Sequence, residues 1–269
     1  MNLSEKTLQA DEFEVINSHT SVDAPETVYF IREEFERLNK KGVKATINYP
    51  RDKDGNHITM WNLIVKKGIP PTRLSRYCCS VLKESSTPDR ICTVGVRASE
   101  SVGRTGRNTF ATRGKTKKDA LFFSLDHAEE VFRESQEMQD DVWDCTLIRQ
   151  MKENKDIIVS PIYEWTDNDI WTYIQEEKLK VNPLYEKGYH RVGCVGCPMA
   201  TYRQKMKEFS DYPTYKTAYI NAFQKMVEKR EIEGKVNNGM WGSGEEVFDW
   251  WIEKYKHEMK GQMSLDDFI

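Results

Sequence analysis

The sequence of 269 residues has little excess charge of either sign and no long hydrophobic run. Its 40 Lys and Arg residues nearly balance 43 Asp and Glu residues, so the net charge of −3 indicates no general attraction to nucleic acid or to an anionic membrane. No apolar run approaches the roughly 18 residues that span a bilayer, and the first residues lack the pattern of a signal peptide. We therefore expect a cytoplasmic protein without a membrane partner.

Two residue types are missing from the ends of the chain. No glycine precedes Gly42, and no cysteine follows Cys197. The first absence argues against a glycine-rich phosphate-binding loop near the start, because such a loop needs backbone conformations that glycine adopts readily. Ser4–Thr7 resembles such a loop only weakly. The second absence leaves no thiol nucleophile after Cys197.

The residues that are present predict a globular α/β protein. Hydrophobic residues make up 38% of the chain, with 7 Trp, 12 Tyr and 11 Phe, which is enough for a sizeable core. Short runs rich in β-branched residues predict strands at residues 13–19, 43–49, 91–97 and 156–162. Helical periodicity lies between and after them, and strands that alternate with helices indicate a parallel sheet flanked by helices.

Three helices are expected from local signals. One begins at Pro25, with an apolar stripe of Val28, Ile31, Phe35 and Leu38. A second begins near a capping-box pattern at Thr166 and Asp169, and a third spans roughly residues 215–227. The second helix is expected to bury Ile170, Trp171 and Ile174. The third has one apolar face, which comprises Tyr215, Tyr219, Ile220, Phe223, Met226 and Val227. We expect an α/β domain at residues 1–205 and a helical C-terminal extension with a short terminal peptide at residues 206–269.

Residues 97–118 form a run with seven basic residues and one acid, and residues 126–144 reverse this with eight acids and one Arg. Solvated surface is the simpler interpretation of both runs. The alternative is an anion-handling loop followed by an acidic helix.

The six cysteines form a more specific pattern. Cys78 and Cys79 are adjacent, and Cys194 and Cys197 form a C-x-x-C turn followed by Pro198. Disulfides are rare in the cytosol, and four thiolates suit either tetrahedral zinc or a [4Fe–4S] cluster. An adjacent pair fits two irons of a cube better than one small ion, so we favour the cluster over zinc. The two remaining cysteines, Cys92 and Cys145, are interpreted as core residues.

Five ordered motifs accompany these cysteines. They are Arg76-Tyr77-Cys78-Cys79-x-x-x-Lys83; Gly95-Val96-Arg97-Ala98-x-Glu100-Ser101-x-x-Arg104; Pro161-Ile162-x-x-Trp165-Thr166-x-x-Asp169-Ile170-Trp171; Asn182-Pro183-Leu184-Tyr185-x-x-Gly188; and Arg191-x-Gly193-Cys194-x-x-Cys197-Pro198. Together they resemble the phosphoadenosine phosphosulfate (PAPS) reductase family. This family includes adenylyl sulfate reductases and ATP-pyrophosphatase-type sulfur-transfer proteins, among them proteins of DNA phosphorothioation.

The resemblance implies a fold like that of adenine nucleotide alpha-hydrolases and a set of functional residues. In the cluster-bearing branch, the four cysteines Cys78, Cys79, Cys194 and Cys197 ligate a [4Fe–4S] centre. The resemblance places Lys83 between this cluster and an adenine nucleotide or adenylyl sulfate substrate. It assigns Arg97 to a phosphate or sulfate group, a task that suits a guanidinium. Arg104 and Arg191 are further candidates for anion binding or for structural ion pairs, and His190 is interpreted as structural rather than as a proton carrier.

The resemblance therefore implies an enzyme of sulfur transfer or reduction on an adenylated substrate, either a phosphoadenylyl or adenylyl sulfate reductase or an ATP-pyrophosphatase-type sulfurtransferase. The family's first strand, its phosphate-binding PP-loop and the terminal catalytic cysteine of adenylyl sulfate reductases are not found in this sequence. The alternative is thus a non-catalytic or split subunit of a DNA-modification or phage-defence complex, with a partner that supplies the PP-loop. The final residues Gln262–Phe268 resemble peptides that dock into sliding clamps, which indicates a possible second partner.

Overall fold

The computed structural model describes residues 2–83, 90–100, 108–112, 122–123, 157–235 and 241–258. The chain divides into two compact units, which we describe separately. Residues 1–86 and 182–269 form unit 1, and residues 87–181 form unit 2. Within the described ranges, no helix combines the length and the apolar character that a membrane crossing requires.

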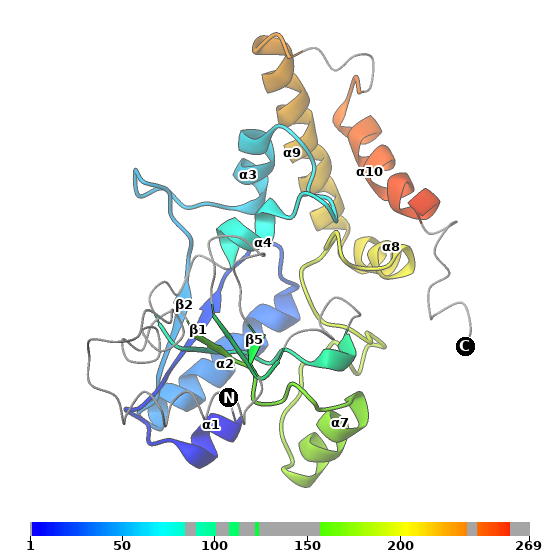
Figure 1. Ribbon diagram of the computed structural model, residues 1–269. Coiled ribbons are helices and arrows are strands. Elements are labelled where there is room, and N and C mark those ends of the chain that lie inside the picture. Colours follow the sequence, from blue (N-terminus) through cyan, green and yellow to red (C-terminus); the bar gives the residue numbers. More distant parts are fainter. Residues whose placement is uncertain are drawn as a thin grey trace. The chain divides into compact units, whose positions relative to one another are not determined.

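Unit 1 begins with a strand–helix–strand arrangement (Figure 1). Strand β1 (Glu14–Ser18) pairs in parallel with β2 (Lys44–Asn48), and α2 (Pro25–Lys40) connects them. Proline at the first helical position starts α2, and Phe35 and Leu38 on its apolar stripe are buried in a small core that includes Val43 and Ala45. The predicted strands at 13–19 and 43–49 and the predicted first helix are confirmed.

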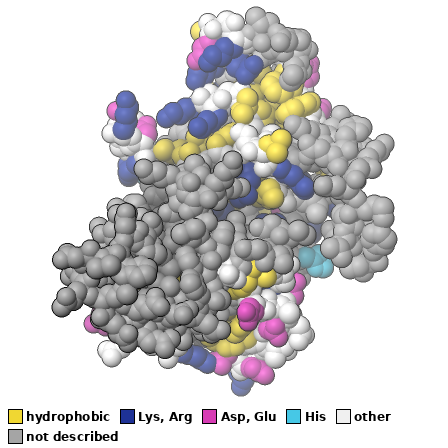
Figure 2. Space-filling model, viewed as in Figure 1, with side chains coloured by type: hydrophobic (Ala, Val, Ile, Leu, Met, Phe, Trp, Pro, Cys, Tyr) yellow, Lys and Arg dark blue, Asp and Glu magenta, His cyan; other side chains and the backbone are white. Residues whose placement is uncertain are grey.

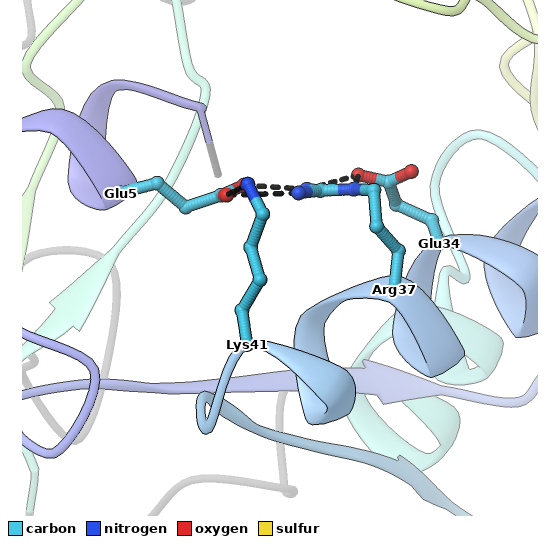
Figure 3. Close-up of polar contacts among 4 residues, drawn as sticks. All are labelled: Glu5, Glu34, Arg37 and Lys41. Carbon is cyan, nitrogen blue, oxygen red and sulfur yellow. Dashed lines mark hydrogen bonds and ion pairs between the residues drawn. The ribbon is translucent and has the colours of Figure 1, made fainter.

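A short N-terminal helix, α1 (Asn2–Thr7), is attached to α2 by ion pairs. Figure 3 shows the carboxylate of Glu5 in contact with Arg37 of α2 and with Lys41, the residue that follows α2. Arg37 binds both carboxylate oxygens of Glu5, at 2.9 and 2.5 Å, and also binds Glu34, while the ammonium group of Lys41 lies 3.0 Å from Glu5. The hydrogen bond from Arg37 is the largest of the effects that lower the pKa of Glu5 from 4.5 to about 2. Ser4–Thr7, the segment that weakly resembles a phosphate-binding loop, therefore lies in helix α1, which the ion pairs of Glu5 attach to α2.

We expect Glu5→Gln to lower the free energy of unfolding at pH 7 by about 1–2 kcal/mol, because a half-buried charge-assisted pair is lost. The partial exposure of Arg37 limits the contribution of this pair to stability. Since the folded-state pKa of Glu5 lies below its unfolded value, the contribution is complete above pH 4.5 and disappears as the pH falls toward 2. Urea unfolding of both proteins at several pH values measures the difference. Glu36→Gln, on the exposed face of α2, is the control. A difference between Glu5→Gln and the wild type that persists at pH 2 would contradict the assignment.

The remaining helices of unit 1 enclose its main core. They are α3 (Met60–Lys67), α4 (Tyr77–Leu82), α8 (Tyr202–Asp211), α9 (Pro213–Ile232) and α10 (Gly244–Glu258). Helix α9 packs against α3 and α10 (Figure 1), and Tyr219, Phe223 and Met226 of α9 are almost completely buried. The predicted third helix is confirmed, although Tyr215 and Ile220 are only half-buried.

Unit 2 contains a small mixed sheet with the strand order β3-β6-β4-β5. Its elements are β3 (Cys92–Thr93), a 3₁₀ turn (Ala98–Glu100), β4 (Phe110–Thr112), β5 (Phe122–Phe123), β6 (Ile157–Val159) and α7 (Asp167–Glu176). β3 and β6 are parallel, whereas β4 runs antiparallel to both β5 and β6.

The α/β class with parallel strands flanked by helices is confirmed, with two differences in detail. Among the described residues the strands form two separate sheets, and the basic stretch 97–118 contains β4. Helix α7 begins with the predicted capping box of Thr166 and Asp169, but the expected burial of its apolar face is wrong. Trp171 is 41% exposed, and Ile170 and Ile174 are only half-buried. Helices α8–α10 of the predicted extension at residues 206–269 pack within unit 1, so that extension is not a separate compact body.

Candidate functional site

The two cysteine pairs come from two distant segments of unit 1. Cys78 and Cys79 occupy the first turn of α4, and the amide of Cys79 donates to the Arg76 carbonyl. Cys194 and Cys197 belong to a tight turn, in which the amide of Cys197 donates to the Cys194 carbonyl at 3.1 Å. All four are free thiols; Cys78 is buried, and the other three are half-buried.

A loop after β1 is joined to the C-x-x-C turn. The amide of Val195 donates to the Val22 carbonyl at 2.7 Å, and Asp23 forms a β-bridge with Cys194. The Cys194 sulfur lies 3.6 Å from the hydroxyl of Thr20 and 3.7 Å from a carboxylate oxygen of Asp23. The site thus lies beside the carboxyl end of a parallel strand, where α/β proteins commonly bind ligands.

The hydrogen bond between Cys78 and Cys79 strongly shifts the pKa values of both thiols. The hydrogen bond to Cys79 and burial both raise the pKa of Cys78, and the charges of Cys194 and Cys197 act in the same direction. The same hydrogen bond lowers the pKa of Cys79, assisted by Arg76, whose guanidinium lies 3.6 Å from the Cys79 sulfur. Burial raises the pKa of Cys194 to about 11. The two pairs are therefore within electrostatic reach of each other.

Lys83 is the cation that both pairs share. It follows directly after α4, and its backbone amide donates to the Cys79 carbonyl. Desolvation alone would lower its pKa, but the negative charges of Cys194, Asp23 and Cys79 hold the pKa above its ordinary value. An ammonium group at this position compensates the negative charge of thiolates.

Helix α8 contacts the C-x-x-C turn through a side-chain hydrogen bond. Gly196 adopts a left-handed conformation with φ of 71°, and its amide donates to the buried carboxylate of Glu208 at 2.7 Å. Gln204 donates to the other oxygen of Glu208 at 2.8 Å. Burial raises the pKa of Glu208, an effect that these hydrogen bonds and the neighbouring charges of Lys205 and Arg191 oppose. The turn is thus fixed by a buried acceptor as well as by the loop after β1.

The four free thiols are the residues of this site that could hold a metal–thiolate cofactor. Cys78 experiences the charges of Cys194 and Cys197, and the cations Arg76 and Lys83 act on Cys79 and Cys194. Among the described residues, no three Cys, His, Asp or Glu side chains are arranged as ligands of a single metal ion. Zinc holds its thiolates at about 2.3 Å in one tetrahedron, whereas a cube distributes four thiolates over four irons.

The predicted anion-binding arginines have different surroundings. Arg97 belongs to unit 2, where its guanidinium lies 2.6 Å from Asp167 and 3.8 Å from Glu100, with only 14% of the side chain exposed. Arg191 is exposed in unit 1, and its carbonyl accepts from Gln204. Arg104 lies outside the described residues. The role of these three in substrate binding stays a prediction.

Other sequence interpretations have mixed outcomes. His190 is exposed, and Cys92 is half-buried on β3. Cys145 and the clamp-like peptide Gln262–Phe268 lie outside the described residues. Sequence reasoning missed Thr20, Asp23 and Glu208, which contact the C-x-x-C turn only through the tertiary fold. The one available signal was the position of Thr20 and Asp23 directly after a predicted strand.

Comparisons with known proteins identify the family to which the chain is similar. The family model described as "Phosphoadenosine phosphosulfate reductase domain" matches residues 3–200. An adenosine 5'-phosphosulfate reductase of Anoxybacillus flavithermus is 35% identical over 54 residues, which cover 20% of this chain and 23% of the relative. An uncharacterised protein of Methanocaldococcus jannaschii is 24% identical over 238 residues, 86% of this chain and 46% of the relative.

A second uncharacterised protein of Methanocaldococcus jannaschii is 33% identical over 88 residues, 32% of this chain and 18% of the relative. In each of these comparisons the matched part spans less than half of the relative's own length. The family match itself covers well over half of this chain. The chain therefore belongs to the phosphoadenosine phosphosulfate reductase family.

Proposed function

We propose that this protein binds a [4Fe–4S] cluster through Cys78, Cys79, Cys194 and Cys197, and that it acts in sulfur transfer or reduction on an adenylated substrate such as adenylyl sulfate. The observation that carries the proposal is that both cysteine pairs and Lys83 belong to one compact unit and interact electrostatically. The family assignment supports the adenylated substrate.

The residues around the thiols have separable tasks in this proposal. Arg76 and Lys83 compensate negative charge at Cys79 and Cys194, which favours the thiolate form needed for ligation. Asp23 and Thr20 hold the Cys194 side of the turn, and Glu208 fixes its backbone. When bound, the cluster would supply an anionic, redox-capable centre.

Lys83 also has the charge to hold a sulfate or phosphate group. An ammonium group that remains protonated attracts an anionic substrate and orients it by charge-assisted hydrogen bonds. In unit 2, Arg97 has the fork of donors that suits a phosphate or sulfate group, and its guanidinium binds Asp167. Zinc in place of the cluster is the alternative cofactor, and it would leave the anion-binding role of Lys83 unchanged.

The test is the binding of adenylyl sulfate to protein purified without oxygen, measured by calorimetry after the iron content and absorbance have been confirmed. We expect binding in the micromolar range and a loss of about 10- to 100-fold for Lys83→Ala, because one charge-assisted interaction with the anion is removed. Lys53→Ala, at an exposed turn, is the control and should bind like the wild type. Equal binding by Lys83→Ala and wild type would contradict the role of Lys83, and no binding by cluster-loaded wild type would contradict the proposed substrate.

A further inference from the structure

A groove in unit 1 lies between α3 and α9, and the site described above does not use it. Its volume is about 840 Å³, and its lining is mainly apolar, with Ile58, Trp61, Val65, Val81, Ala218 and Ala222. These side chains come from α3, α9, the end of α4 and the segment before α3. Figure 2 shows hydrophobic side chains on this part of the molecule with Lys and Arg side chains beside them.

The polar lining of the groove is strongly one-signed. Lys66 and Lys67 line it from α3, and Lys225 and Lys229 line it from α9. The acid in the lining, Asp52, accepts hydrogen bonds from the amides of Asp54 and Asn56. An apolar floor flanked by lysines on both sides is complementary to a segment that carries apolar side chains on one face and carboxylates beside them.

The shape and chemistry of the lining favour a peptide helix over a nucleic acid. Single-stranded nucleic acid binds on exposed aromatic faces, but the aromatic ring of this lining, Trp61, packs edge-on against Tyr219 with ring centroids 5.0 Å apart. The small side chains of Ala218 and Ala222 leave space above α9 for inserted aliphatic side chains. Two helices that border an apolar groove present the arrangement in which amphipathic helices dock with anchors three or four residues apart.

We propose that this groove binds an acidic amphipathic helix of a partner protein, with aliphatic anchors on the floor and carboxylates beside the lysines of α3 and α9. This inference is independent of the proposed cluster and substrate, since none of its residues belongs to that site.

The experiment uses the full chain and a fluorescent synthetic helix of about 16 residues, with leucines every three or four positions and glutamates between them. We expect saturable binding by anisotropy that weakens with added salt. Lys66→Glu/Lys225→Glu should weaken binding by at least about tenfold, because two attractive contacts become repulsive. Ala218→Trp, which fills the groove, should weaken it to a similar extent.

The matched control is Arg32→Glu/Lys40→Glu, which makes the same change of charge on the exposed face of α2 and should leave binding within about twofold. Circular dichroism verifies that each variant is folded. Equal losses in both double variants, or no effect of Ala218→Trp, would overturn the proposal in favour of non-specific charge attraction. Stronger binding of oligothymidylate, or of a peptide that comprises residues 259–269 of this chain, would overturn it in favour of a nucleic acid or of the chain's own end.

Discussion

Gly196→Ala is expected to lower the free energy of unfolding by about 2–4 kcal/mol. The residue has φ of 71°, where a side chain is strained. An added Cβ would also lie 2.8 Å from the Phe209 ring, 3.0 Å from Tyr219 and 3.2 Å from Trp251. These rings contact one another at the centre of the core, so none can move without displacing the others. Urea unfolding measures the loss.

Gly188→Ala provides a matched control for this prediction. Gly188 has a similar φ of 78°, but nothing lies within 4 Å of an added Cβ, so the variant has the conformational strain without the collision. We expect a loss of about 1 kcal/mol there. Equal losses at both positions would show that the aromatic rings yield, and that contact with them does not fix the C-x-x-C turn.

Local signals predicted the fold where a segment determines its own structure. Pro25 and the stripe that follows it predicted α2, and the reciprocal hydrogen bonds of Thr166 and Asp169 begin α7 as their spacing indicates. Strand β4 was missed because it has only three residues and lies in a basic stretch without β-strand alternation. The error at Trp171 has a related cause, since the periodicity of a helix does not show whether another element covers its apolar face.

The candidate site divides in the same way. The cysteine spacing and the family resemblance predicted the four thiols and Lys83 as site residues, because each motif is short and contiguous in sequence. The residues that hold the C-x-x-C turn in place have no comparable signal in the sequence. Asp23 is remote from Cys194 in sequence, and Glu208 is one acid among 43 Asp and Glu residues. Only the packing of α8 and of the β1 loop against the C-x-x-C turn distinguishes them.

The largest functional effect is expected from the cysteines themselves. Protein purified without oxygen should contain about four irons and four sulfides per chain, with the broad visible absorbance of a cluster. Cys78→Ser and Cys197→Ser, one from each pair, should each retain less than about one iron per chain, because a serine hydroxyl is a poor ligand for iron in a cluster. Metal analysis and absorbance of the anaerobic proteins measure both results.

Cys92→Ser is the matched control, because Cys92 is a half-buried free thiol on β3 that belongs to neither pair. It should keep the full iron content. About one zinc and no iron per chain in the wild type, with the zinc lost in both pair variants, would show that the four cysteines bind structural zinc and not a cluster. Equal iron in the pair variants and in Cys92→Ser would contradict metal binding by the four cysteines, and the pKa shifts of Cys78 and Cys79 would then describe two neighbouring thiols only.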